Sequence, residues 1–326
     1  MKKISLLLIT IFFVSMMGFS QTEDFKTSGK PFMKIFTNYH SSFSDGESFS
    51  AFEVDRVYLG YEYAFSKNFS AKANFDIADP GTGKLHMTAY LKNAYIKYNS
   101  NNFTASFGLI STNQFSVQEK AWGFRYIAKS FQDEYKFNAS ADLGASIAYK
   151  FSDMLSADMI IANGEGYKNL QTDSTFRTGF GLTLNPVKNL TARVYYDFST
   201  NENTQSSLAA FLGYVTADFS FSMEYNKQYN VSFKDGYELS GSSFYATVKA
   251  SKKLKVFARY DQLLSNTVAG ETNDWNISKD GQLFIAGLEY APVKGIKLAP
   301  NFKGWNPTDS SKAFVTTIFL NCEIKF

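Results

Sequence analysis

The feature that most constrains this chain is a repeated alternation of apolar and polar residues in segments of about ten residues. In the last segment, Phe314, Ile318 and Leu320 fall on one side, while Asn321 and Glu323 fall on the other. Successive side chains of a β-strand point to opposite faces, so each segment predicts a strand with one apolar and one mostly polar face. The pattern recurs from about residue 31 to the end of the chain, so most of this part is predicted to be β-structure.

We count about sixteen such segments, an even number that suits a closed antiparallel wall. The clearer ones cover residues 57–65, 69–77, 103–109, 143–151, 190–198, 219–225, 254–260, 284–290 and 314–326. The weaker ones cover residues 31–39, 88–98, 154–162, 175–184, 206–214, 243–250 and 296–303. Short connections such as 66–68 alternate with long ones such as 41–50, 79–86 and 110–139. A tilted strand of this length spans a bilayer, so the prediction is an all-β, transmembrane antiparallel β-barrel.

Composition and the first residues agree with an exported barrel. The chain has 33 Phe, 20 Tyr and one Cys, and its mean hydropathy is −0.22. Lys2 and Lys3 precede an apolar run over 4–17, and Gly18 and Ser20 are small, so residues 1–20 are predicted to be a signal peptide cleaved before Gln21. Residues 21–326 would form the barrel domain. Removing two lysines lowers the net charge from +3 to +1, which gives no reason to expect a nucleic-acid partner.

The terminal aromatic Phe326 closes a strand, and this segment resembles the carboxy-terminal sorting signal of bacterial outer-membrane barrels. The resemblance implies recognition by the barrel-assembly machinery and a location in the outer membrane of a Gram-negative bacterium. The lipid bilayer itself would then be a partner of the apolar face.

The longest irregular stretch, residues 110–139, carries much of the unusual chemistry. Its aromatic residues, among them Trp122, Phe124 and Phe131, seek burial, and the simplest site is the inside of the barrel. We therefore predict that this third extracellular loop folds into the lumen and forms a pore constriction. Its basic side chains either bind passing anions or form ion pairs with its acidic side chains, and ion pairing is the favoured interpretation. The charged residues brought to the constriction would be Glu119, Lys120, Arg125, Lys129, Asp133 and Glu134.

The order of residues in this loop resembles the phosphate-selective porin O and P family. The similarity rests on Glu119, Trp122-Gly123, Arg125-Tyr126, Lys129, Phe131, Asp133, Tyr135 and residues 140–144, with further likeness at 52–71 and 162–167. It implies a sixteen-stranded channel, typically a homotrimer, in which the third loop is the constriction and many lumenal Arg and Lys residues select phosphate.

Alternation also assigns charged residues to the lumen. The basic residues singled out there are Arg56, Lys72, Arg177, Arg193 and Arg259. Of these, Arg56, Lys72 and Arg193 are expected level with the third loop. Basic residues outnumber acidic ones on this face by about five, which biases a narrow pore toward anions. The excess is not a dense basic ladder, so it predicts a weak anion preference without specificity for phosphate.

The favoured function is a passive diffusion channel for small hydrophilic solutes, not an enzyme, without cofactors. One alternative is a barrel enzyme, which needs a nucleophile with a positioned base. The other is a surface adhesin or anchor with a plugged lumen. His40 and His86, the two histidines, are expected in surface loops, far apart and without a metal-binding pattern.

Overall fold

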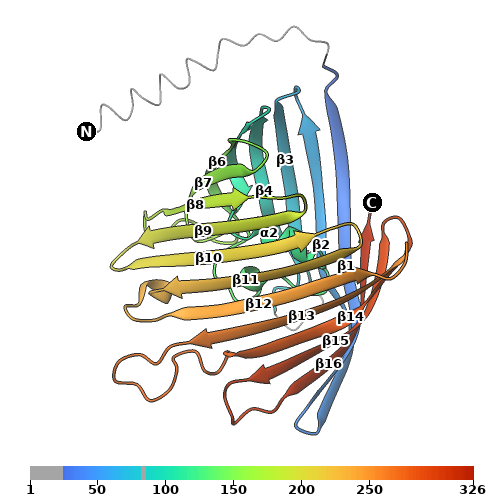
Figure 1. The fold of residues 1–326 in the computed structure, drawn as a ribbon, viewed down its shortest axis with the longest axis vertical. Coiled ribbons are helices and arrows are strands. Elements are labelled where there is room, and N and C mark those ends of the chain that lie inside the picture. The colour runs from blue at the N-terminus through green and yellow to red at the C-terminus, as the bar shows by residue number, and fades with distance from the viewer. Residues whose placement is uncertain (1–24, 82–85) are drawn as a thin grey trace.

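The computed structural model describes residues 25–81 and 86–326, so the predicted signal peptide, residues 1–20, lies outside the described residues. In the described part of the chain, sixteen strands form one closed barrel, and every neighbouring pair is antiparallel (Figure 1). Each strand pairs with its neighbours in sequence, and the first strand pairs with the last. The predicted fold class is confirmed.

Each predicted segment overlaps one observed strand. The first eight strands are β1 (Ser28–Ser44), β2 (Glu47–Ala64), β3 (Phe69–Ala78), β4 (Thr88–Asn99), β5 (Phe103–Ser111), β6 (Ala141–Lys150), β7 (Leu155–Ala162) and β8 (Arg177–Leu184). The others are β9 (Leu190–Thr200), β10 (Thr204–Val215), β11 (Phe219–Tyr229), β12 (Leu239–Lys249), β13 (Leu254–Ser265), β14 (Gly281–Val293), β15 (Ile296–Pro307) and β16 (Val315–Lys325). Helices α2 (Ser116–Trp122) and α3 (Phe131–Glu134) lie between β5 and β6, and a 3-10 turn η1 (Val231–Phe233) precedes β12. Over the described residues, no helix has both the length and the apolar content needed to cross a membrane.

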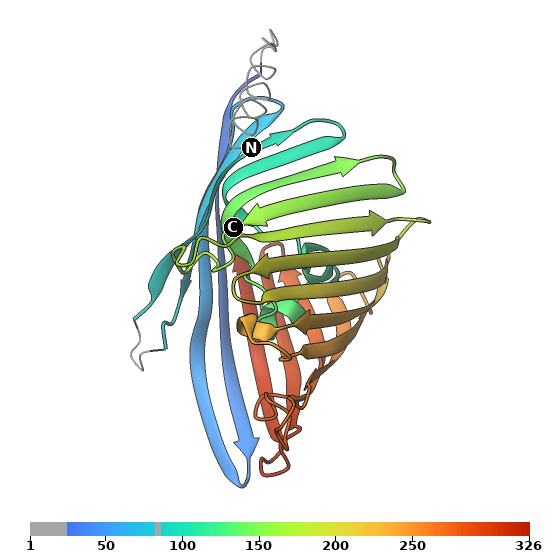
Figure 2. The same ribbon diagram turned by 90° about the vertical axis from the view of Figure 1, so that its left-hand side faces the viewer.

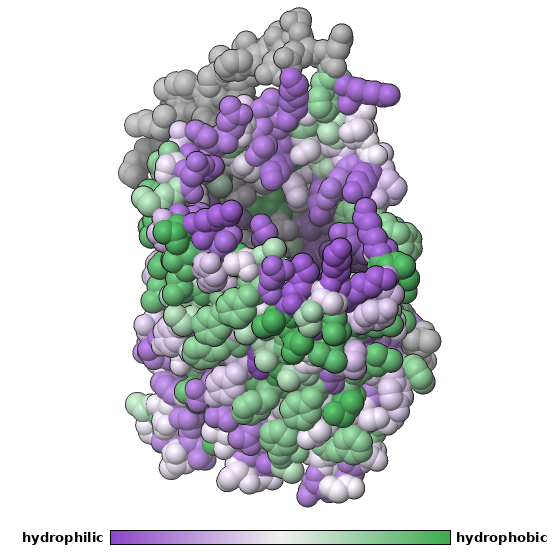
Figure 3. All heavy atoms as spheres, turned by 45° about the vertical axis from the view of Figure 1, so that its right-hand side comes forward, coloured by the Kyte–Doolittle hydropathy of each residue, from purple (hydrophilic) through white to green (hydrophobic). Residues whose placement is uncertain are grey.

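Alternation sorts the side chains as the sequence predicts. On β16, Ile318 is 49% exposed on the outer face, whereas Asn321 is 3% exposed on the inner face. Figure 3 shows apolar residues gathered on the outer wall and hydrophilic residues around a hollow. Backbone groups in hydrocarbon need partners within the wall, and closure of β1 on β16 supplies them for what would otherwise be two edge strands.

The connection expected at residues 41–50 is not a loop. β1 and β2 continue through it as a long hairpin, the long pair of blue strands in Figure 2, and turn at Asp45 and Gly46 with φ of 49° and 79°. An Asp-Gly pair favours such a two-residue turn because both positions need positive φ. His40 therefore lies on β1, buried between strands, and the expectation of a surface loop there is wrong. His86 does lie in a connection, between β3 and β4.

A β-bulge changes the inner face of β4. Asn74 pairs with Asn93, but the next residue, Phe75, pairs with Leu91, so Lys92 is the extra residue. Lys92 and Asn93 consequently both turn inward: the Lys92 ammonium lies 4.0 Å from Asp76, and the Asn93 side chain is buried. A bulge re-aims side chains in this way, and it adds a cation to the lumen that strict alternation does not assign there.

Candidate functional site

Residues 112–140, here called the inserted segment, connect β5 to β6 and contact the inner wall. Three of the hydrogen bonds between them involve tyrosine hydroxyls. The Tyr126 hydroxyl donates to Glu289 on β14 at 3.0 Å, and the Tyr135 hydroxyl donates to Asp261 on β13 at 3.3 Å. The Tyr245 hydroxyl of β12 donates to the Gln118 carbonyl at 3.2 Å. The partners on β12, β13 and β14 face inward and are buried, so the segment packs against the inside of this wall.

Aromatic packing holds the inserted segment to the same strands. Trp122 and Phe124 are buried, and the centroids of the Phe124 and Phe257 rings lie 4.5 Å apart, with Phe257 on β13. The Trp122 indole also meets the Tyr245 ring edge-on at 5.7 Å, and its N–H donates to the Ala128 carbonyl at 3.0 Å. Burial of such rings stabilises by about 1.5–3 kcal/mol each, which explains why this long stretch is ordered.

Two wall arginines anchor the backbone of the inserted segment. Arg193 on β9 donates to the Asn113 carbonyl at 3.0 Å, and Arg259 on β13 donates to the Lys129 carbonyl at 2.6 Å. Both side chains are fixed by carboxylates: Arg193 forms two hydrogen bonds to Asp158, and Arg259 forms two to Asp261. Paired and buried in this way, they act on the segment as positioning residues and not as free cations of a pore.

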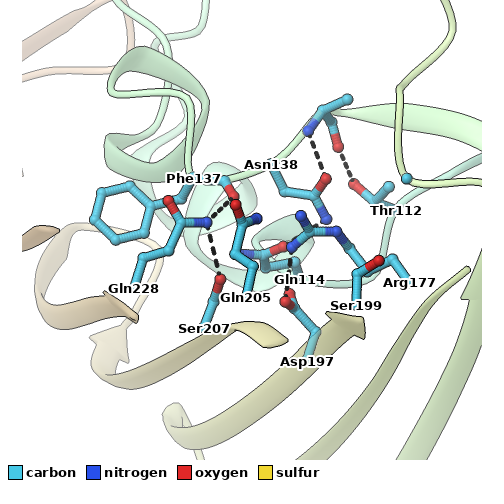
Figure 4. Close-up of polar contacts among 12 residues, drawn as sticks. Thr112, Gln114, Phe137, Asn138, Arg177, Asp197, Ser199, Gln205, Ser207 and Gln228 are labelled. Atoms are coloured by element: carbon cyan, nitrogen blue, oxygen red, sulfur yellow. Dashed lines mark hydrogen bonds and ion pairs between the residues drawn. The ribbon is translucent and has the colours of Figure 1, made fainter. Parts of the chain in front are cut away.

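The carboxyl end of the inserted segment is fastened by neutral groups. In Figure 4 the Gln228 amide points at the Phe137 carbonyl, 2.9 Å away, and the Asn138 amide donates to Gln114 at 2.7 Å. The Thr112 hydroxyl donates to the Ala139 carbonyl at 2.8 Å, so the two ends of the segment meet. Beside them lies the buried Arg177–Asp197 ion pair, at 2.8 Å.

The phenols of the inserted segment are held in their neutral form. Burial raises the pKa of Tyr126 above its ordinary value, and the neighbouring Glu289 carboxylate raises it further. Burial and Asp261 likewise raise the pKa of Tyr135. Both hydroxyls therefore keep the proton that they donate to the wall.

Across the lumen from these anchors, Asp76 on β3 organises a second cluster. This carboxylate is 1% exposed; it accepts from Arg56 at 3.1 Å and from the Tyr167 hydroxyl at 2.7 Å. Tyr167 belongs to the connection between β7 and β8, which thus reaches the β3 wall. The Lys92 ammonium lies over the rings of Tyr58 and Tyr167, at 5.1 and 5.5 Å from their centres.

Among the hollows of the described structure, two are lined by many basic residues and both touch Ser140. The first, here called the Lys34 cavity, has a volume of about 540 Å³. Its seven basic residues are Lys34, Lys72, Lys92, Lys120, Arg125, Lys297 and Lys325, against Glu119 and Glu323. The second, the Lys129 cavity, has about 410 Å³. Its five basic residues are Arg56, Lys129, Lys136, Lys168 and Arg177, against Asp133 and Glu165.

The structure separates the residues named from the sequence into two groups. Arg56, Lys72, Lys120, Arg125, Lys129 and Arg177 line one of the two cavities, as do Glu119 and Asp133. Arg125 lies 3.4 Å from Asp133 and 3.9 Å from Glu119, so part of the expected pairing within the segment is present. Glu134 is exposed, and Arg193 and Arg259 are anchors that line neither cavity.

Sequence reasoning missed Lys92 and Tyr167. Lys92 reaches the lumen through a bulge, which leaves no mark in the alternation of apolar residues. Tyr167 sits in the Asn-Gly-Glu-Gly-Tyr stretch at 163–167, whose glycines indicate a turn but not where that turn reaches. Over the described residues, no group of three or more His, Cys, Asp or Glu side chains could hold a metal ion.

Replacing Tyr167 by Phe should release the connection between β7 and β8. The change removes a hydrogen bond to a buried carboxylate, and such a bond contributes about 1.5–3 kcal/mol. We expect trypsin to cleave after the exposed Lys168 roughly tenfold faster than in the parent protein. Tyr290→Phe, on the outer face of β14, is the matched control and should leave the rate unchanged; equal rates for both variants would contradict the role given to Tyr167.

No protein-family model and no curated protein matches the sequence. Many solved structures do resemble this barrel. The outer-membrane channel DcaP of Acinetobacter baumannii aligns with a TM-score of 0.66 and 12% identity, covering 94% of this chain and 99% of that chain. An anion-selective porin from Comamonas acidovorans aligns with a TM-score of 0.66 and 11% identity, covering 92% of this chain and 100% of that chain. OprB of Pseudomonas putida aligns with a TM-score of 0.69 and 9% identity, covering 91% of this chain and 94% of that chain. At these identities the likeness establishes the fold alone, a β-barrel of the kind found in these outer-membrane porins and channels.

Proposed function

We propose that the protein is an outer-membrane porin, a water-filled passive diffusion channel for small hydrophilic solutes with a preference for anions. The observation that carries the proposal is the charge of the Lys34 cavity, where seven basic residues face two acidic ones. Charges in a narrow pore with low-dielectric walls are weakly screened, so an excess of this size attracts anions and opposes cations.

The excess of basic residues in the Lys34 cavity attracts anions because several of its lysines have no described carboxylate nearby. Over residues 25–81 and 86–326, no carboxylate oxygen lies within 4.0 Å of the ammonium groups of Lys34, Lys120 or Lys325. By contrast, Lys72 lies 3.1 Å from Glu62, and Lys297 lies 3.3 Å from Glu289. A lysine whose charge is not matched by a neighbouring carboxylate contributes most to the potential that a passing ion meets.

The preference we propose is for anions in general and not for phosphate. Arginine presents a planar fork that binds phosphate through two parallel hydrogen bonds, whereas lysine acts as a point charge. The Lys34 cavity has one arginine, Arg125, and it already lies beside Asp133 and Glu119. The other arginines singled out from the sequence are paired with Asp76, Asp197, Asp158 and Asp261.

The remaining expectations belong to the same proposal. The chain would be exported after cleavage of residues 1–20, assembled by the barrel-assembly machinery through the strand ending in Phe326, and inserted in the outer membrane of a Gram-negative bacterium. A homotrimer is the assembly we propose, because one similar structure, OmpT of Vibrio cholerae, is described as a trimer form (TM-score 0.58, 13% identity).

A channel accounts for the lumen better than an enzyme or a plugged anchor. His40, the buried histidine, lies 3.0 Å from Asn38 and 3.7 Å from Glu53 and contacts the rings of Phe49 and Phe319, which gives it no nucleophile to activate. A plug has no need of two hollows lined by an excess of cations.

Planar-bilayer recording tests the proposal. Purified protein should insert from detergent and give stepwise increases in current as single channels enter the membrane. Across a KCl gradient, the reversal potential should have the same sign as the chloride equilibrium potential. Absence of conductance from protein that is folded, judged by its heat-modifiable migration on a gel, would overturn the channel. A reversal potential near zero would overturn the anion preference alone.

A further inference from the structure

We propose that the Lys34 cavity is a binding site for organic anions with an aromatic body, such as aryl carboxylates. The inference rests on the proposed channel function and specifies the solutes that the channel favours. The site lies where the barrel closes: β1 pairs with β16, the last strand, on one side and with β2 on the other. We call the β1–β16 pair the seam.

The inner face of β1 alternates ring, cation, ring. Phe32, Lys34 and Phe36 are successive inward residues of the strand, and all three line the cavity. Tyr58 of β2 lies directly opposite Lys34 in the register and meets the Phe36 ring edge-on at 5.7 Å. Phe36 is only 3% exposed, so the partly exposed Phe32 and Tyr58 supply most of the aromatic surface beside Lys34. They can hold an apolar ring while the ammonium holds a carboxylate.

The other side of the seam adds a second cation. Lys325 of β16 is the register partner of Lys34 on β1, and the pair shares the inner face. Like charges directly opposite each other destabilise a sheet, and no described carboxylate lies within 4.0 Å of either ammonium. An anion bound between them would relieve this repulsion, so the arrangement indicates an anionic ligand more strongly than a lone lysine would.

Neighbouring cations also lie on aromatic faces. The Lys72 ammonium is 4.9 Å from the centre of the Phe32 ring, and that of Lys92 is 5.1 Å from the centre of the Tyr58 ring. These contacts hold positive charge beside apolar surface, which suits a ligand that carries both features. Phe115 of the inserted segment also lines the cavity, although its side chain is only 3% exposed.

Size and chemistry exclude a site designed for a small inorganic ion. The cavity has about 540 Å³, within the range of roughly 300–1,000 Å³ that small-molecule sites occupy. A hydrated chloride or phosphate ion gains nothing from the aromatic surface of Phe32 and Tyr58, and lysine does not offer the fork that phosphate recognition favours. An aryl carboxylate uses both the rings and the point charges.

The test measures how added benzoate, acetate or phosphate reduces the chloride current through the channel in a planar bilayer. We expect benzoate to reduce it at a concentration about tenfold lower than acetate or phosphate does, because only benzoate uses the aromatic wall. Equal potency of benzoate and acetate, in a channel that still prefers chloride, would overturn this inference and leave the proposed function intact. Absence of any current would overturn both.

Variants locate the site. Lys34→Gln with Lys325→Gln should weaken the block by benzoate about tenfold, and Phe32→Ser should weaken the block by benzoate while leaving that by acetate unchanged. Lys150→Gln, at the exposed end of β6, is the matched control. Block by benzoate that is the same in all these variants would overturn the placement, provided that each conducts chloride.

Discussion

Deleting residues 113–138 of the inserted segment should increase the single-channel conductance several-fold and reduce the anion preference. Residues 113–138 fill the lumen beside β12, β13 and β14, and they carry Lys120 and Arg125 of the Lys34 cavity. Thr112 and Ser140 are already joined by a backbone hydrogen bond of 3.2 Å, so a short Gly-Ser linker can close the gap without strain. Removing these residues widens the water-filled path. It also removes four cations, Lys120, Arg125, Lys129 and Lys136, and three carboxylates, Glu119, Asp133 and Glu134, which is a net loss of one positive charge.

The experiment compares conductance and reversal potential of the deletion with those of the parent protein in KCl. Deletion of residues 268–273, in the exposed connection between β13 and β14, is the matched control and should change neither quantity. If the deleted barrel folds and conducts no more than the parent, the inserted segment does not restrict the pore.

Replacing Arg259 by Leu should destabilise the barrel by about 3–5 kcal/mol, because the change leaves the Asp261 carboxylate buried without its cation. Asp261 keeps hydrogen bonds from Ser243 and Tyr135, which are neutral and compensate only in part. The inserted segment also loses the hydrogen bond to the Lys129 carbonyl. The free energy of unfolding is measured by urea titration of the protein in lipid vesicles.

Two variants separate the ion pair from general damage. Lys227→Gln breaks an exposed pair with Glu238 and should cost less than about 1 kcal/mol. Replacing both Arg259 and Asp261 by Leu should recover much of the lost stability, since no uncompensated charge then remains. A single Arg259→Leu variant as stable as the Lys227→Gln variant would refute the anchoring role.

Much of the fold follows from the sequence alone, because alternation is a local property of each strand. It assigns Ile318 outward and Asn321 inward without knowledge of any partner strand. The Asp45-Gly46 turn is equally local, and it went unrecognised because a long loop was expected there. The count of strands required no more than this.

The contacts inside the lumen are harder to predict from alternation than the strands are. Alternation predicts that Arg193 and Arg259 face inward, which is correct, but not that each binds a backbone carbonyl of the inserted segment. The destination of an inward side chain depends on what else enters the lumen. Nor does alternation reveal the bulge that turns Lys92 inward.

The sequence by itself determined the strands, their faces and the excess of basic residues inside, because each depends on residue type and on the two-residue repeat. Only the tertiary structure decided which charges stay free. Lys34 and Lys325 come from opposite ends of the chain and meet because the first strand must pair with the last to leave no open edge in the wall. Closure is a property of the whole barrel, and so is the cavity that it creates at the seam.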